Sequence, residues 1–205
     1  MRAVLELSAN GWNASRTSDA MRAVRRGGLV NDGGRRYLLL VGVSFVLIAL
    51  DQVTKMFVMH TMHLHESIPV IPDFFNLTYI RNPGAAFGIF AQSNSAFRLI
   101  FFVGTSIFAL GLLGTIFYRL HPDDVWGQLT VSSIFGGAIG NLIDRLRFGE
   151  VIDFLDFHIK GYHWPAFNVA DSAISVGVVS LLIIFALDKK KEDPPAGTLP
   201  QENLP

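Results

Sequence analysis

The chain has 205 residues, of which 50% are apolar and 17% charged, a balance too apolar for an ordinary soluble domain. The formal net charge is zero and the basic residues form no stripe beside stacking aromatics, so no nucleic-acid partner is expected. The absence of cysteine excludes disulfides, cysteine-bound metals and thiol nucleophiles. A single membrane-embedded domain is the expected class.

Residues 1–36 are polar, rich in Gly and Arg and without helical periodicity, which predicts a disordered cytoplasmic N-terminal extension. The four residues from Met1 to Val4 recur from Met21 to Val24, which raises the hypothesis that translation starts at Met21. No cleaved signal peptide is expected, because the basic stretch leads straight into a full-length apolar segment.

Four long apolar segments follow, each close to the ~20 residues that a helix needs to cross the hydrocarbon core. They cover about residues 37–59, 99–118, 125–143 and 168–187. The first continues past Asp51 and Lys55, and three consecutive lysines close the last. Residues 189–205 contain four prolines and are predicted to form a disordered cytoplasmic tail.

Basic residues near the span ends favour a topology with both chain termini in the cytoplasm, since basic loops are retained there. The cytoplasmic set comprises Arg22, Arg25, Arg26, Arg35, Arg36, Arg119, Lys189, Lys190 and Lys191. The smaller outer set comprises Arg81, Arg98, Arg145, Arg147 and Lys160. The predicted fold is therefore an all-α membrane protein with four transmembrane helices, and its longer loops lie on the extracytoplasmic side.

Three carboxylates on three predicted helices fall at one depth. Asp51 lies fourteen residues after Tyr37, roughly 20 Å along a helix, while Asp144 and Asp171 lie at the outer ends of the third and fourth spans. Ionisable groups inside spans are costly and usually functional. Alternative interpretations are an Asp51–Lys55 pair on one helix face, an ordinary interfacial helix end at Asp144, and first-turn helix chemistry at Asp171.

The outer loops contain further ordered patterns. Residues 75–80 alternate as a strand does, which predicts a small sheet lying on the membrane. Residues 82–88, from Asn82 to Gly88, combine turn residues with small side chains that allow another backbone to come close. Residues 151–157 form a short apolar run that adds Asp153 as a fourth carboxylate at the same level.

Several other polar and small residues have simpler interpretations. Gly136, Gly137 and Gly140 form a small face suited to close helix packing, and Asn141 lies one turn before Asp144 and can donate to a carboxylate. The histidines at 60, 63 and 65 are interpreted as solvated residues and no metal site is predicted. Tyr162 and Trp164 are typical of an interfacial aromatic belt.

Five segments together resemble the bacterial lipoprotein signal peptidase, or signal peptidase II, family over about residues 37–188. They are Asp51-Gln52-x-x-Lys55, the run from Arg81 to Gly88, the run from Gly136 to Arg145, Val151-Ile152-Asp153-Phe154, and Phe167-Asn168-Val169-Ala170-Asp171-Ser172. The segments occur in the family's order, and only the two tails lie outside the resemblance. Residues 37–188 would thus be a four-helix membrane peptidase domain with a small extracytoplasmic sheet.

The resemblance implies an aspartyl endopeptidase that removes the signal peptide from diacylglyceryl-modified prolipoproteins, just before the lipidated cysteine. It implies Asp153 and Asp171 as the catalytic pair, with substrate-binding or supporting roles for Asp51, Lys55, Asn82, Gly137, Asn141, Asp144, Arg145, Asn168 and Ala170. No cofactor is implied. The expected partners are lipid-modified precursors and membrane lipid, and the enzyme would be a monomer in the bacterial inner membrane with its active site at the outer face.

Physical reasoning from the residues alone offers Asp144 as readily as Asp153 for the partner of Asp171. It also leaves rival classes to compare. A proton-coupled transporter would place its acids at the midplane within inverted repeats, and an intramembrane protease of the Gly-x-Gly-Asp type would need a motif that this sequence lacks. A non-enzymatic membrane subunit would leave the converging carboxylates unexplained.

Overall fold

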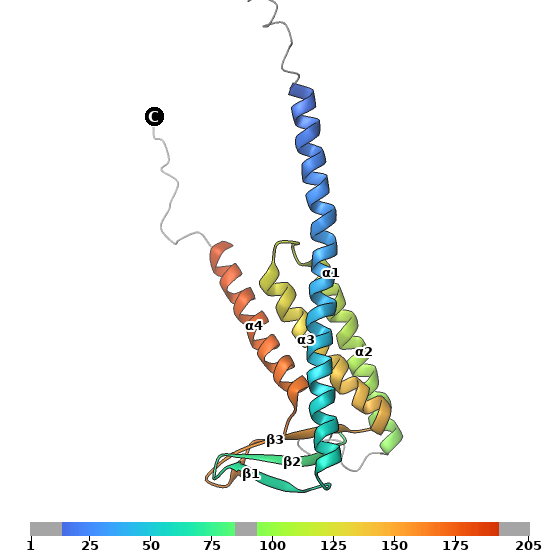
Figure 1. Cartoon of the computed structure of the whole chain (residues 1–205), viewed down its shortest axis with the longest axis vertical. Helices are drawn as coiled ribbons and strands as arrows, with labels where there is room; N and C mark the ends of the chain where they lie inside the picture. The colour runs from blue at the N-terminus through green and yellow to red at the C-terminus, as the bar shows by residue number, and fades with distance from the viewer. Residues whose placement is uncertain (1–13, 85–93, 193–205) are drawn as a thin grey trace, which may run out of the picture.

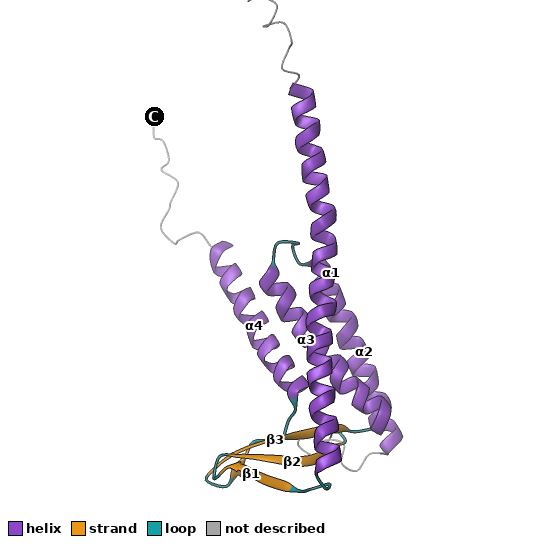
Figure 2. Cartoon of the chain, viewed as in Figure 1, coloured by secondary structure: helices purple, strands orange, loops and turns teal. Residues whose placement is uncertain are grey.

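The computed structural model describes residues 14–84 and 94–192, with side chains from 34 to 84 and from 94 to 187. A helical bundle stands on a small antiparallel sheet that crosses one of its ends (Figure 1; Figure 2). The helices are α1 (Ala14–Thr61), α2 (Ser95–Arg119), α3 (Val125–Phe148) and α4 (Val169–Glu192). The strands are β1 (Ser67–Ile71), β2 (Phe75–Asn82), β3 (Val151–Ile159) and β4 (Tyr162–His163).

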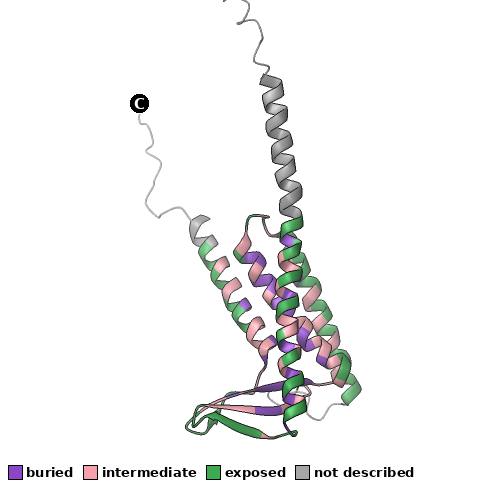
Figure 3. Cartoon of the chain, in the orientation of Figure 1, coloured by how far each residue is buried: buried purple, intermediate pink, exposed green. Residues whose placement is uncertain are grey.

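Three stretches of helix are long and apolar enough to cross a membrane: Gly34–Thr61, Ser95–Arg119 and Val169–Leu187. The fourth predicted span, α3, is a helix of 24 residues that is not among them. It packs against α1, α2 and α4, and buried residues follow its length (Figure 3). Because its neighbours cover it, α3 can carry polar side chains that a lipid-facing helix would avoid.

Two helix boundaries differ from the sequence-based expectation. Helix α1 begins at Ala14, so residues 14–36 are helical where an extension without regular structure was expected, and residues 1–13 lie outside the described part. Helix α3 continues past Ile143 to Phe148, so Asp144 lies within a helix and not at its end. The α3 terminus is set by Gly149, whose φ of +74° suits a left-handed C-cap.

The predicted strand at residues 75–80 is confirmed as part of β2. The sheet order is β1-β2-β3-β4, and the β2–β3 register aligns Asn82 with Val151 and Ile80 with Asp153. An apolar cluster attaches the sheet to the end of α1; its buried members are Val58, Met62, Tyr79, Ile152 and Phe154. The first residues of α1 and the last of α4 lie at the opposite end of the bundle from the sheet (Figure 1).

The small face of α3 brings its neighbours close, as predicted. A Cβ atom added at Gly136 would lie 2.9 Å from Ser44 Cα of α1, and one added at Gly137 would lie 2.6 Å from the Ala170 carbonyl oxygen of α4. At Gly140 the added atom would lie 2.7 Å from Asp51 Oδ2. These contacts draw α1 and α4 onto α3 at the level where the carboxylates lie.

Candidate active site

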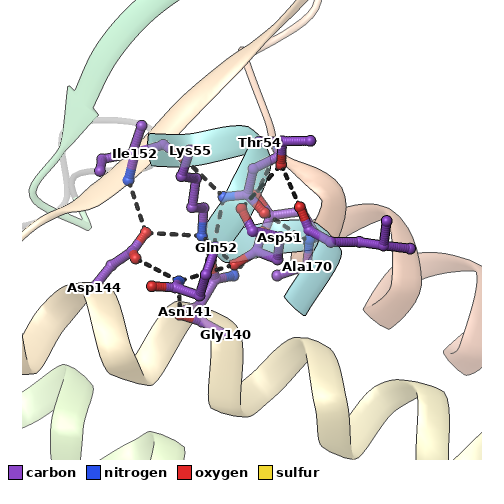
Figure 4. A network of polar contacts seen from close by, with 12 residues as sticks. Asp51, Gln52, Thr54, Lys55, Gly140, Asn141, Asp144, Ile152 and Ala170 are labelled. Atoms are coloured by element: carbon purple, nitrogen blue, oxygen red, sulfur yellow. Dashed lines mark hydrogen bonds and ion pairs between the residues drawn. The ribbon is translucent and has the colours of Figure 1, made fainter. Parts of the chain in front are cut away.

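The ammonium group of Lys55 lies at the centre of a buried polar cluster between α1 and α3 (Figure 4). Its Nζ lies 2.8 Å from Asp51 Oδ2, 2.7 Å from Asp144 Oδ2 and 3.0 Å from Asn141 Oδ1. Lys55 is 1% exposed, and both carboxylates are 0% exposed. The i, i+4 pair of Asp51 and Lys55 therefore exists, but a second carboxylate from another helix joins it.

The oxygens of the two carboxylates also accept hydrogen bonds from other groups. Asp51 Oδ1 accepts from the Ala170 backbone N–H at 3.0 Å, which ties α1 to the first turn of α4. Asp144 Oδ1 accepts from Gln52 Nε2 at 2.9 Å, and its Oδ2 accepts from the Ile152 backbone N–H at 3.2 Å. Asp51 and Asp144 thus connect three helices and β3, and each buried oxygen has a partner.

Asn141 connects this cluster to α4. Its Oδ1 accepts from Lys55, while its Nδ2 donates to Asp171 Oδ1 at 2.7 Å. Asp171 is only partly buried, in contrast to Asp51 and Asp144. Asp171 is therefore the carboxylate of the three that both joins the network and reaches open space.

Asn168 and Asp171 form a reciprocal cap at the start of α4. The Asp171 backbone N–H donates to Asn168 Oδ1 at 2.9 Å, and the Asn168 backbone N–H donates to Asp171 Oδ2 at 3.3 Å. This is the geometry of a capping box, with Asn and Asp in place of the usual residues. The alternative of first-turn chemistry at Asp171 is correct as well, and it fixes the orientation of the carboxylate.

Asp153 on β3 receives two amide donors. Asn168 Nδ2 donates to its Oδ1 at 2.8 Å and Asn82 Nδ2 donates to its Oδ2 at 2.9 Å. Burial, assisted by the charge of Asp171, raises the pKa of Asp153 to about 7, although the two amide donors oppose that shift. Asp153 is 2% exposed, so a proton can remain on this carboxyl near neutral pH.

The chain that follows Asn82 makes a turn that needs glycine. Gly84 has φ +87° and its N–H donates to Asn82 Oδ1 at 2.9 Å, which aims the Asn82 amide at Asp153. A side chain at Gly84 would overlap the Phe102 ring of α2. The rest of the predicted turn, residues 85–88, lies outside the described residues.

A groove of about 310 Å³ opens beside Asp171 between α2, α3 and α4. Its polar wall includes Asn141 and Arg145 of α3, while Ala109, Leu113 and Ile174 supply apolar surface. Arg145 also lies over the Phe102 ring, with its guanidinium carbon 5.3 Å from the ring centre. The groove is thus apolar along most of its wall and charged at one end.

The structure brings the predicted site residues into one region. Hydrogen bonds and ion pairs link Asp51, Lys55, Asn82, Asn141, Asp144, Asp153, Asn168, Ala170 and Asp171, while Gly137 packs on Ala170 and Arg145 lines the groove. Sequence reasoning missed Gln52, which donates to Asp144 and to the Gly140 carbonyl. An uncharged polar residue beside Asp51 in an apolar helix was the signal that could have found it.

Carboxylates from separate elements that meet beside an apolar groove, in a bundle with helices long enough to cross a membrane, are the arrangement that a membrane-embedded aspartic hydrolase requires. The family model described as "Signal peptidase (SPase) II" matches residues 43–187. The chain belongs to the signal peptidase II family.

Individual relatives agree with this placement. The lipoprotein signal peptidase of Syntrophotalea carbinolica is 51% identical over 148 residues, which cover 72% of this chain and 91% of that protein. The Geobacter sulfurreducens lipoprotein signal peptidase is 47% identical over 158 residues, covering 77% of this chain and 98% of that protein. A solved structure described as a bacterial membrane enzyme matches with a TM-score of 0.66 and 36% identity over 75% of this chain and 91% of that one.

Proposed function

We propose that Asp153 and Asp171 form the catalytic dyad with which this membrane aspartyl endopeptidase removes signal peptides from diacylglyceryl-modified prolipoproteins. Membership of the signal peptidase II family supplies the reaction class and the substrate. The choice of these two acids, the position of the cleavage site just before the lipidated cysteine, and the supporting roles of their neighbours are the proposal.

The observation that carries the proposal is the shared contact of both acids with Asn168. The Asn168 amide donates to Asp153, and its backbone N–H donates to Asp171. Asp144, the alternative partner, forms an ion pair with Lys55, accepts hydrogen bonds from Gln52 and the Ile152 backbone N–H, and is 0% exposed. This arrangement favours Asp153 over Asp144 as the partner of Asp171, a choice that the sequence left open.

The two acids have different roles in the mechanism. Asp153 keeps its proton near neutral pH, because burial raises its pKa to about 7, and donates to the scissile carbonyl oxygen. Asp171 accepts a proton from water, whose oxygen attacks the carbonyl carbon. When the tetrahedral intermediate collapses, Asp171 passes that proton to the leaving amine nitrogen, the peptide bond breaks, and one hydroxyl of the intermediate returns a proton to Asp153.

The groove beside Asp171 suits a substrate that has a hydrophobic helix next to a polar cleavage site. Its apolar wall along α2, α3 and α4 suits a hydrophobic signal helix, while Asn141, Arg145 and Asp171 supply polar partners at the end near the scissile bond. A substrate whose lipid chains stay in the bilayer would present its cleavage site at this level. Membrane lipid would surround the enzyme during the reaction.

We extend the proposal to the membrane arrangement. Helix α3 crosses the membrane as the fourth span within the 37–188 peptidase domain, shielded by the other three helices. Both termini are cytoplasmic, the sheet and the dyad lie at the outer face of the bacterial inner membrane, and residues 1–36 and 189–205 are cytoplasmic extensions. The proposed site is complete within one chain, which supports a monomer.

The test uses the purified full chain in detergent with a lipidated precursor. We expect Asp153→Asn and Asp171→Asn each to lower kcat by at least about a thousandfold. The thermal midpoint of unfolding should stay at the wild-type value, which shows that both variants fold. Asp156→Asn is the matched control, because Asp156 lies on the same strand and pairs instead with His163 and Asn76. Full activity in either dyad variant would overturn the assignment.

A further inference from the structure

We propose that Lys55 is a positioning residue for this reaction. It holds the Asn141 amide so that its N–H group, and not its oxygen, meets Asp171. This inference rests on the proposed function, since it explains how the Asp171 carboxylate of the dyad is oriented.

The Lys55 ammonium group is surrounded by three oxygen acceptors. An ammonium group has three N–H donors and no acceptor. The three acceptors around Nζ are Asp51 Oδ2, Asp144 Oδ2 and Asn141 Oδ1, at 2.8, 2.7 and 3.0 Å. Lys55 thus donates hydrogen bonds to Asp51 and to the neutral amide of Asn141, and it forms an ion pair with Asp144.

The contact with Lys55 imposes one orientation on the Asn141 side-chain amide. Because an ammonium group only donates, the Asn141 atom that faces Lys55 must be the oxygen, and Nδ2 then faces Asp171 Oδ1 at 2.7 Å. The reversed amide would place its N–H groups against the ammonium and its oxygen against the carboxylate. Both contacts would be repulsive in a site screened from water.

Asn168 also contacts Asn141, but its contribution is smaller. Its Nδ2 lies 3.2 Å from Asn141 Oδ1 and 3.2 Å from the Ile152 carbonyl oxygen, but 2.8 Å from Asp153 Oδ1. A primary amide has only two N–H donors for these three acceptors. Lys55 is thus the stronger constraint on Asn141, with a full charge and a shorter contact.

The Asn141 N–H group acts directly on Asp171 of the dyad. An N–H donor aimed at Asp171 holds its Oδ1 oxygen in place, which orients the carboxylate that accepts a proton from water. The other charged groups near Asp171 are Arg145 on α3, Asp153 on β3, and the Asp51 and Asp144 carboxylates behind Asn141. Described α2 residues facing it in the groove, Thr105, Ser106, Ala109 and Leu113, carry no charge. The Asn141 amide therefore donates to Asp171, and its contact with Lys55 sets this orientation.

A double-mutant cycle tests this with the full chain in detergent and a lipidated precursor. The variants are Lys55→Met, Asn141→Leu and the pair together, and the readouts are kcat, KM and the thermal midpoint. We expect each single variant to lower kcat about tenfold with little change in KM. The double variant should match Asn141→Leu, because Lys55 acts through Asn141.

Gln52→Leu is the control, since Gln52 donates to Asp144 and Asp51 but makes no hydrogen bond to Asn141. Gln52→Leu should lower kcat less than Asn141→Leu does. If Lys55→Met does not fold, the cycle is run in the Asp144→Asn background, which restores the cluster's net charge of −1 once the lysine is gone. Additive effects in the cycle, or an equal loss of kcat in Gln52→Leu, would reduce Lys55 to a structural ion-pair partner. Either result would overturn the inference and leave the dyad assignment intact.

Discussion

Asn168 Nδ2 donates a hydrogen bond of 2.8 Å to Asp153 Oδ1, and this contact joins the residue before α4 to β3 of the sheet. Asn168 also caps α4 through Asp171. The same residue therefore determines where the helix begins and where the two proposed catalytic acids meet.

The first prediction concerns pH. The pKa of Asp153 is raised to about 7, mainly by burial, so its protonated form is abundant below pH 7 and is lost above it. We expect kcat/KM to fall with a limb near pH 7 as the pH is raised from 6 to 9. The measurement is a pH series on the wild-type enzyme with a lipidated precursor, and an activity that keeps rising to pH 9 would contradict the assigned acid.

The second prediction concerns Asn82, which donates to Asp153 and thereby stabilises its ionised form. Removing the donor by Asn82→Leu should raise the pKa of Asp153 further and move the basic limb upward by about one pH unit. Asn76→Leu is the control, because Asn76 lies on the same strand but donates to Asp156. A downward shift, or the same shift in both variants, would count against the proposed contact.

The third prediction concerns packing at Gly137. A methyl group there would meet the Ala170 carbonyl oxygen, so Gly137→Ala should reduce the free energy of unfolding by about 1–3 kcal/mol. Gly111→Ala on α2 meets no atom within 4 Å and should be neutral or slightly stabilising. Thermal unfolding in detergent compares the two, and equal midpoints would show that α3 and α4 separate easily at this level.

The fourth prediction concerns topology. The chain has no cysteine, so one introduced cysteine gives a unique label site. Lys160→Cys, an exposed position in the turn between β3 and β4, should react with an impermeant thiol reagent added outside intact spheroplasts. Asp123→Cys, an exposed position between α2 and α3, should react only after the membrane is opened. The opposite pattern would invert the proposed orientation.

Much of the architecture could be predicted from residue patterns. Hydropathy located the helices, and alternation located β2, because both properties repeat along the chain with a period set by local geometry. The start of α1 at Ala14 and the end of α3 at Phe148 were not predicted. Position 144 looked like a span end because the charged pair Asp144-Arg145 interrupts the apolar run, yet the helix continues because Asp144 pairs with Lys55 inside the bundle and Arg145 lines the groove.

The sequence by itself determined that this is a membrane protein with acids on several helices at one depth, because depth along a helix follows directly from residue spacing. Only the tertiary structure decided which acid faces which partner. Asp144 and Asp153 are close in sequence. Asp144 forms an ion pair with Lys55, whereas Asp153 accepts hydrogen bonds from Asn168 and Asn82. Hydrogen-bond partners depend on how α1, α3, α4 and β3 pack against one another, and no spacing along a single segment contains that information.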